Sequence, residues 1–249
     1  MSYLIEKMKT TVSSIGEFLS PRSMYILESI FNYLSVGQWM KIHGFRTAAR
    51  FNDRDDAFRL AAGSIGHQKV LYLEFGVWKG DSMRLWSKLL TNPESMLHGF
   101  DSFQGLPQEW SAVYPKGSFS MDGNVPVIDD PRVRFFKGWF GCTLPQYQLP
   151  EHETMFVNCD ADLHSSTKTI LDYIGPYIRP GDYLYFDEFH HSNHERRAFE
   201  EFLESSGFRV RMVACSNSRS QVLFVRENED LDQAYSRGAV TACEAAASR

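Results

Sequence analysis

The sequence VLYLEFGVWKGDS, residues Val70–Ser82, decides the fold. An apolar run that ends in an acid leads into a turn with two spaced glycines, and an amphipathic stretch follows as far as Leu90. This pattern predicts a buried strand that enters a helix through a tight turn. Glycine lets the backbone approach a ligand, and the first turn of the helix supplies free N–H groups. We therefore predict that this turn helps to bind a cofactor, through Glu74, Gly76, Gly80 and Ser82.

Strand-like and helix-like segments alternate from Lys69 onward. The predicted strands are Val70–Glu74, Met96–Asp101, Val133–Lys137, Met155–Cys159, Tyr183–Asp187, Phe208–Ala214 and Gln221–Val225. The predicted helices between them are Ser82–Leu90, Ser166–Ile178 and His194–Ser205. Such alternation implies an α/β fold with a mostly parallel sheet covered on both faces. The last two strands are joined by a turn too short for a crossover helix, so we expect an antiparallel hairpin at one edge.

Three regions fall outside this alternation. Residues 1–60 contain no convincing strand and read as helical, so we predict an N-terminal helical cap over 1–66 ahead of a domain at 67–227. The segment 108–131 is long and rich in Gly, Pro and Asp, and it is either a substrate lid or a surface insertion. The Ala-rich tail, 228–249, is expected to be a frayed helix.

Composition limits the class of protein. The net charge of −5 argues against a nucleic-acid partner bound mainly through the phosphate backbone. The four cysteines show no metal or disulfide spacing, and no segment has the roughly 18 apolar residues of a membrane span. We therefore expect a cytoplasmic protein with no membrane partner. Oligomeric state stays open, and a homo-oligomer in which the N-terminal helices cover a neighbour's site is compatible with the sequence.

An acid ends the second predicted strand of the sheet domain. Asp101 follows Gly80 by 21 residues, the place where a parallel α/β sheet holds ribose hydroxyls, and Ser102 stands beside it. The alternative is that Asp101 only starts a turn with Ser102. Because the glycine spacing is not GxGxxG, a small nucleoside cofactor fits better than a dinucleotide.

Three further acids end two other strands: Asp160, Asp187 and Glu188. Ligands of parallel sheets lie beyond the carboxyl ends of the strands, and converging carboxylates repel one another unless they are protonated or share a cation. Oxygen ligands of this kind favour Mg²⁺ or a similar divalent ion. Asp162 is either a fourth member or a cap. The alternative is that these acids belong to unrelated turns, with Asp160 capping the next helix.

Histidines follow the last of these acids in the sequence HHSNHE, residues 190–195. His190 and His194 are four residues apart and would share one face of a helix, which makes a zinc or iron site conceivable. The favoured interpretation is a loop before a helix, with Ser192 or Asn193 as the cap and the imidazoles in solvent.

Five motifs in order then resemble one family. They are EFGVWKGDS (74–82), GFDSFQGLP (99–107), FKGWFGCTLP (136–145), DADLHSST (160–167) and PGDYLYFDEF (180–189). Together they resemble the macrocin O-methyltransferase (TylF/MycF-type) family of metal-dependent S-adenosylmethionine enzymes. The closing SQVLFVR (220–226) is similar to the last strand of that family.

The resemblance implies a Rossmann-like class I methyltransferase fold with seven strands, the last antiparallel. It also implies that Glu74, Gly76, Gly80, Ser82 and Asp101 hold S-adenosylmethionine, and that Asp160, Asp187 and Glu188 hold the metal. This sequence has Glu188 where the family has a second Asp, Ala161 for Gly, His164 for Tyr and Cys142 for an acid.

The predicted reaction is methyl transfer to a hydroxyl of a small molecule, with a sugar or glycosylated secondary metabolite, such as an antibiotic, as the acceptor class. Asp160, His190 or His191 would accept the proton, and Mg²⁺ would stabilise the oxyanion. Two alternatives stay open. One is a metal-dependent hydrolase or oxygenase that uses Asp187, Glu188, His190, His191 and His194, and the other is a catalytically silent relative that binds the cofactor.

Overall fold

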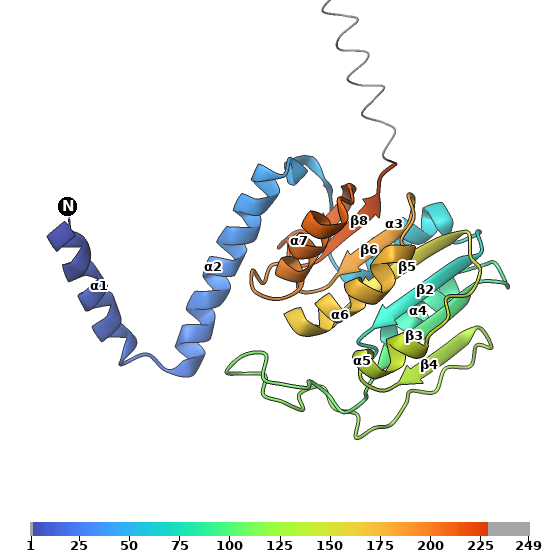
Figure 1. The fold of residues 1–249 in the computed structure, drawn as a ribbon, viewed down its shortest axis with the longest axis horizontal. Coiled ribbons are helices and arrows are strands. Elements are labelled where there is room, and N and C mark those ends of the chain that lie inside the picture. The colour runs from blue at the N-terminus through green and yellow to red at the C-terminus, as the bar shows by residue number, and fades with distance from the viewer. Residues whose placement is uncertain (1, 229–249) are drawn as a thin grey trace, which may run out of the picture.

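The computed structural model describes residues 2–228, and its centre is one eight-stranded sheet with helices on both faces (Figure 1). The strand order is β1-β7-β8-β6-β5-β2-β3-β4. Strand β8 runs antiparallel to both of its neighbours, β6 and β7, and every other pair in the sheet is parallel. The predicted class I, Rossmann-like architecture with an antiparallel last strand is therefore confirmed.

The elements follow the predicted alternation closely. The strands are β1 (Ala49–Phe51), β2 (Val70–Phe75), β3 (Met96–Asp101), β4 (Val133–Lys137), β5 (Thr154–Cys159), β6 (Tyr183–Phe186), β7 (Val210–Ser216) and β8 (Val222–Arg226). The α-helices are α1 (Ser2–Gly16), α2 (Pro21–Ile42), α3 (Arg54–Ile65), α4 (Asp81–Leu89), α5 (Phe140–Thr143), α6 (His164–Ile174) and α7 (Glu195–Ser206). Short 3₁₀ turns lie at Phe45–Thr47, Leu144–Gln146 and Gly175–Tyr177.

Alternate side chains of the central strands enter two separate cores. In β2, Leu71, Leu73 and Phe75 face the core beneath α2, α6 and α7, whereas Val70 and Tyr72 face the core beneath α3 and α4. Both faces are buried because the crossover helices cover both sides of a parallel sheet. At roughly 1.5–3 kcal/mol for each buried large apolar side chain, these two cores stabilise the fold.

Strand β1 departs from the prediction. Residues 1–60 were expected to contain no strand, and the sheet to have seven, but Ala49–Phe51 pairs in parallel with β7 as an eighth strand. Three residues are too few for their periodicity to be visible in the sequence. Helix α3 also packs on the sheet, through Phe58 and Ala61, although it falls within the predicted 1–66 cap. The hairpin of β7 and β8 forms as expected, but it does not lie at the edge of the sheet, since β1 pairs with β7.

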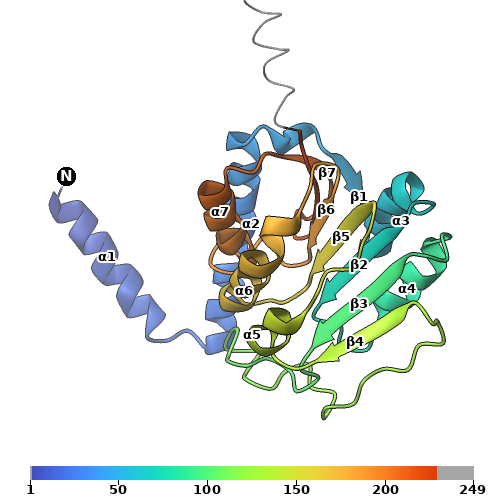
Figure 2. The same cartoon turned by 45° about the vertical axis from the view of Figure 1, so that its right-hand side comes forward.

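Helix α2 starts where capping chemistry places it. Ser20 accepts a hydrogen bond from the backbone N–H of Ser23 (3.1 Å), and Pro21 occupies the first turn, where its missing N–H costs nothing. One face of the helix, with Asn32, Val36 and Trp39, is buried against the sheet domain. Helix α1, in contrast, stands away from the rest of the molecule (Figure 2).

No helix among the described residues is long and apolar enough to cross a membrane. The predicted frayed helix of the tail lies outside the described residues, apart from residue 228.

Candidate active site

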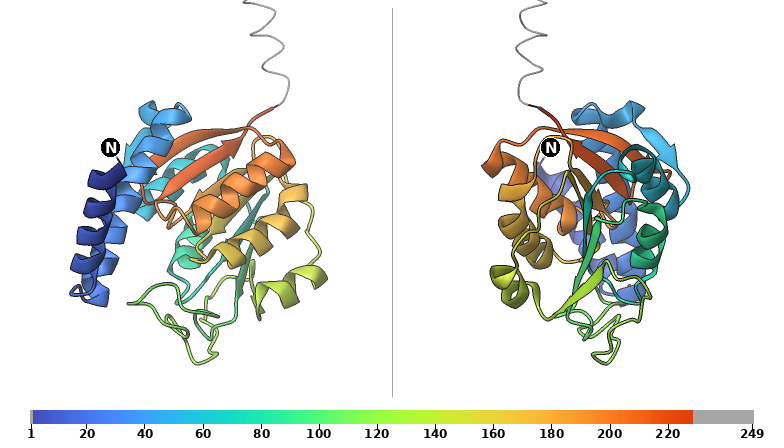
Figure 3. Two further views of the ribbon diagram at one scale, coloured as in Figure 1. Left: turned by 60° about the vertical axis from the view of Figure 1, so that its left-hand side comes forward. Right: turned by 90° about the vertical axis from the view of Figure 1, so that its right-hand side faces the viewer.

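A cavity of about 680 Å³ opens at the carboxyl ends of the parallel strands. It lies where parallel α/β sheets bind ligands. Its walls come from the ends of β2, β3, β5 and β6, from α2, and from the long loop after β3, which lies beside the N-terminal end of α2 (Figure 3). Of the predicted site residues it brings together Glu74, Gly76, Ser82, Asp101, Ser102, Asp160, Asp187, Glu188 and His190.

The glycine turn between β2 and α4 is built for close approach. Gly76 has φ +93°, and a Cβ there would lie 1.7 Å from the carbonyl oxygen of Asp160, so no other residue fits. Gly80, with φ +78°, forms the N-cap of α4 and is not among the residues that line the cavity. The two glycines therefore differ in role: Gly76 lies at the cavity and Gly80 sets the start of the helix.

The carboxylate of Asp101 fixes the shape of this wall. One of its oxygens accepts the N–H of Trp78 (2.8 Å) and the other accepts the N–H of Phe103 (2.7 Å). Asp101 therefore does start a turn, which was the alternative to ribose binding in the sequence analysis. Asp101 also lines the cavity, and each oxygen keeps a second lone pair for a ligand hydroxyl.

Glu74 is buried below the turn. The hydroxyl of Tyr72 donates to its carboxylate (3.0 Å), and burial raises the pKa of Glu74 to about 8. The side chain of Asn158 in turn donates to the Tyr72 hydroxyl (3.0 Å). Glu74 therefore anchors a polar network inside the sheet as well as lining the cavity.

Four acids line the cavity next to the glycine turn, after β5 and β6: Asp160, Asp162, Asp187 and Glu188. We call them the acid wall. Burial and the nearby charge of Asp187 raise the pKa of Asp162 to about 7 and that of Glu188 to about 8. The pKa of Asp160 is raised by the same two causes, against the lowering effect of Arg54. Asp187 is oriented by Tyr185, whose hydroxyl donates to it (2.8 Å), and by the Gln221 amide (2.9 Å). Carboxylates crowded in this way suit a hard divalent cation, which would offset their mutual repulsion.

Two residues that the sequence analysis missed organise these acids. Arg54, at the start of α3, donates to Asp160 (3.2 Å) and is the cation that faces the acid wall. Glu195 is fully buried and accepts the N–H groups of Ala161 (3.2 Å) and Glu188 (2.9 Å). It thus ties the loop after β5 to the loop after β6. Asp160 does not cap α6, since Leu163 is the N-cap residue there.

The histidines are arranged differently from the prediction. His190 and His191 are buried, not in solvent, and α7 begins after them, so His190 and His194 do not share a helix face. The cap position of α7 is held by His194, and neither Ser192 nor Asn193 holds it. Burial lowers the pKa of His190 to about 4 and that of His191 to about 3, so both are neutral at pH 7.

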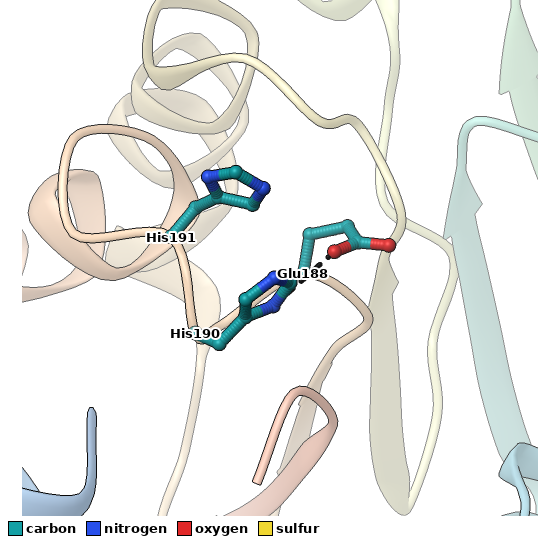
Figure 4. Close-up of side chains that lie close together, drawn as sticks. All are labelled: Glu188, His190 and His191. Carbon is teal, nitrogen blue, oxygen red and sulfur yellow. Dashed lines mark ion pairs between the residues drawn. The ribbon is translucent and has the colours of Figure 1, made fainter. Parts of the chain in front are cut away.

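Glu188, His190 and His191 form a compact group (Figure 4). Their ligand atoms lie within 4.8 Å of one another, and Nδ1 of His190 is 3.3 Å from the Glu188 carboxylate. Among residues 2–228, no other set of three His, Cys, Asp or Glu side chains brings its ligand atoms this close together. Asp160, Asp187 and Glu188 line the same cavity, but their carboxylate oxygens do not all lie within 4.8 Å of one another. His194 lies outside the group.

Asn32 on α2 determines the tautomer of His191. The Asn32 side-chain oxygen accepts from the N–H (3.2 Å) and the hydroxyl (2.9 Å) of Ser192, so its amide nitrogen faces Nδ1 of His191 (3.2 Å). Nδ1 is then the acceptor and Nε2 carries the proton. His191 is not among the residues that line the cavity, whereas His190 lines it and stacks on Tyr33 with ring centroids 4.5 Å apart.

Aromatic side chains form the outer wall. Tyr25 and Tyr33 come from α2, and Trp110, Tyr114 and Phe119 come from the loop after β3. Trp110 and Tyr114 stack with centroids 5.0 Å apart, and Tyr114 stacks on Phe119 at 5.4 Å. This wall suits a ligand with an apolar face.

Backbone strain gathers at the same cavity. Trp78 (φ +49°), Phe119 (φ +65°) and Asp162 (φ +59°) line it in a left-handed conformation that residues other than glycine rarely adopt. Such strain persists only where surrounding structure imposes it, and it clusters at functional sites.

Known proteins resemble the chain in sequence. Residues 124–218 match the macrocin O-methyltransferase (TylF) family. A tetracenomycin-C rhamnosyl 4'-O-methyltransferase of Streptomyces olivaceus is 28% identical over 138 residues, 47% of this chain and 52% of the relative. Mycinamicin III 3''-O-methyltransferase of Micromonospora griseorubida is 28% identical over 118 residues, 45% of this chain and 43% of the relative. The chain thus matches about half the length of these relatives.

Solved structures agree in fold. The O-methyltransferase NovP aligns with TM-score 0.56 and 22% identity, covering 70% of this chain and 80% of NovP. The calicheamicin methyltransferase CalS11 aligns with TM-score 0.51 and 21% identity, covering 88% of this chain and 85% of CalS11. The family match over residues 124–218, the ordered motifs and the shared fold agree: this chain is similar to the macrocin O-methyltransferase family.

Proposed function

We propose that the protein transfers a methyl group from S-adenosylmethionine to a hydroxyl of a small molecule, with the help of a divalent cation such as Mg²⁺. One observation carries this proposal: a single cavity holds both the glycine turn with Asp101 and the wall of four acids. The named relatives methylate glycosylated compounds, so a sugar or glycosylated secondary metabolite is the acceptor class that we propose. A cytoplasmic location stays a prediction.

The cofactor assignment uses the turn side of the cavity. Gly76 lines the cavity there, and Asp101 and Ser102 offer oxygens to ribose hydroxyls. When bound, S-adenosylmethionine supplies an electrophilic methyl group. The residues of the turn would hold the nucleoside and fix the direction of the methyl group toward the acid wall, and such alignment is worth up to about 7–11 kcal/mol of barrier lowering.

The metal assignment uses the acid wall. We propose that Asp160, Asp187 and Glu188 hold the cation, with Asp162 beside them. When bound, the cation supplies charge that stabilises the oxyanion of the acceptor. Tyr185 and Gln221 would hold Asp187 in place, and Glu195 would hold the two loops together.

Either Asp160 or His190 would accept the proton of the hydroxyl. Both line the cavity, and His190 is neutral at pH 7 because burial depresses its pKa. His191 is a weaker candidate, since its Nδ1 already accepts a hydrogen bond from Asn32.

Calorimetry with S-adenosylhomocysteine tests the cofactor assignment. Wild-type protein should bind it, and Asp101→Asn should bind at least about tenfold more weakly, because a charge-assisted hydrogen bond is lost. Asp172→Asn, at an exposed acid on α6 that pairs with Lys168, is the matched control and should bind like wild type. Failure of the wild-type protein to bind would refute the proposal.

The compact group of Glu188, His190 and His191 favours a second candidate, a transition-metal hydrolase or oxygenase. Elemental analysis of the purified protein distinguishes the two. Stoichiometric zinc or iron would support the second candidate, and Mg²⁺ dependence without either metal would support methyl transfer.

We also propose that the functional division of the chain is a helical arm up to about residue 48, followed by the α/β domain, with residues 108–131 as a substrate lid. The aromatic residues that this segment places on the outer wall support the lid.

A further inference from the structure

The cavity is strongly acidic, which limits how it can hold S-adenosylmethionine. Among the described residues that line it, seven are aspartates or glutamates, and two are an arginine and a lysine, Arg54 and Lys79. The amino-acid end of the cofactor carries a carboxylate. Like charges nearby disfavour a carboxylate unless an opposite charge lies beside it. One of these two bases must therefore face the carboxylate of the cofactor.

Lys79 lies on the nucleoside side of the cavity and faces solvent. Its side chain is exposed, and its ammonium stands over the ring of Trp78, 4.2 Å from the ring centroid. Trp78 in turn donates its backbone N–H to Asp101, where we propose that the ribose binds. An exposed ammonium at this place would contribute little to the binding of a carboxylate, because water screens the pair.

Arg54 lies on the other side of the glycine turn. Its Nη1 donates to Asp160 (3.2 Å), and the carbonyl oxygen of Asp160 is the atom that a Cβ on Gly76 would meet. The Arg54 side chain is 31% exposed and lines the cavity. Within residues 2–228 this bond to Asp160 is the hydrogen bond that the guanidinium makes, so Nε and Nη2 are available to a ligand.

The span from Asp101 to Arg54 suits the length of the cofactor. Asp101 ends β3, Asp160 follows β5, and β2 with its glycine turn lies between these two strands. Neighbouring strands are about 4.8 Å apart, so the ends of β3 and β5 are roughly 10 Å apart. Six single bonds join the ribose ring to the carboxylate, and an extended chain of that length spans roughly 7 Å. The ribose ring itself bridges the remainder.

We propose that Arg54 binds the carboxylate at the amino-acid end of S-adenosylmethionine, while the glycine turn and Asp101 hold the nucleoside. This inference rests on the proposed function, because it takes the cofactor as given. A guanidinium can present two parallel N–H groups to a carboxylate, which an ammonium cannot do. Arg54 precedes all five motifs of the sequence analysis, so the resemblance assigns it no role.

Calorimetry with two ligands, in chelator, tests the proposal. S-adenosylhomocysteine has the carboxylate, and its decarboxylated analogue keeps the ammonium but has no carboxylate. Relative to wild type, Arg54→Met should bind S-adenosylhomocysteine at least about tenfold more weakly, because a charge-assisted contact is lost. It should bind the analogue at least as well as wild type does, since a positive charge near the ammonium has gone. Undiminished binding of the analogue also shows that the variant is folded.

Two further variants separate a direct contact from a general effect of charge. Arg54→Lys keeps the charge without the forked geometry, and it should recover only part of the affinity for S-adenosylhomocysteine. Arg59→Met, on the same helix but paired with Asp55 at the surface, is the matched control and should bind both ligands like wild type.

The outcomes distinguish this inference from the proposed function. If Arg54→Met bound S-adenosylhomocysteine as wild type does, or lost affinity for both ligands equally, the carboxylate contact would be overturned and the proposed function would stand. Wild-type protein that binds neither ligand would overturn both.

Discussion

Arg54 is the residue on which the charge balance of the acid wall depends. Its guanidinium pairs with Asp160, and it lies near three further ionisable groups of the site, Asp187, Tyr185 and Glu74. No signal in the sequence marks it, because an arginine at the start of a surface helix is ordinary. Only the packing of α3 against the sheet brings it to the cavity.

Replacing Arg54 with Met should strengthen the binding of Mg²⁺. Removing one positive charge at roughly 6 Å from a divalent ion is worth about a factor of ten in affinity, even at the dielectric of water. Calorimetric titration of Mg²⁺ measures this change. Arg59→Met, on the same helix but paired with Asp55 at the surface, is the control and should bind like wild type. Equal affinity in the Arg54 variant would place the cation elsewhere.

Glu74 should make stability depend on pH. Its pKa is raised to about 8 by burial, so the folded protein resists the ionisation that the unfolded chain undergoes near pH 4.5. The stability that the protonated form contributes is complete below pH 4.5 and is lost as pH rises toward 8.

The variant Glu74→Gln removes this titration. The difference in Tm between the variant and wild type, measured in chelator, should shift in favour of the variant between pH 5 and 8 and then level off. Glu94→Gln, at an exposed acid, should show no such trend. A difference that does not change with pH would mean that Glu74 is ionised in the folded protein throughout this range.

The turn between β2 and α4 is the element that the sequence marks most clearly. Strand, glycine turn and helix could be predicted from Val70–Ser82 because burial and positive φ leave direct marks in the sequence. The helices α6 and α7 were predicted with starts shifted by one or two residues, since a cap such as Leu163 or His194 lacks the usual capping side chain.

Gly76→Ala should destabilise the protein by about 3 kcal/mol or more, because a Cβ would collide with Asp160 and φ +93° is unfavourable. Chemical denaturation measures the loss. Gly63→Ala, in the middle of α3 with nothing within 4 Å of a Cβ, should instead stabilise by about 0.5–1 kcal/mol. If both variants had the same stability, the close contact between Gly76 and the backbone of Asp160 would be contradicted.

For the molecule as a whole, the sequence predicted the central strands and their parallel sense better than the composition of the site. Asp101, Asp160, Asp187 and Glu188 were predictable because each follows an apolar strand, and parallel strands end at one edge. Arg54 and Tyr33 were not, because α3 and α2 lie far from these acids in the chain and meet them only through packing. Glu195 was not, because its role depends on hydrogen bonds to the backbone of two loops. Strand β1 was also not predicted, because it is recognisable only by its pairing with β7.

Cofactor and cation are proposed to bind side by side in one cavity, next to the glycine turn and the acid wall. This is tested by calorimetric titration of S-adenosylhomocysteine and of Mg²⁺ into wild type, Glu188→Gln and the control Glu204→Gln, an exposed acid on α7. All three proteins should bind S-adenosylhomocysteine, and Glu188→Gln alone should lose Mg²⁺ binding. Wild-type protein that binds neither ligand, or a Glu188→Gln variant that binds Mg²⁺ as wild type does, would contradict it.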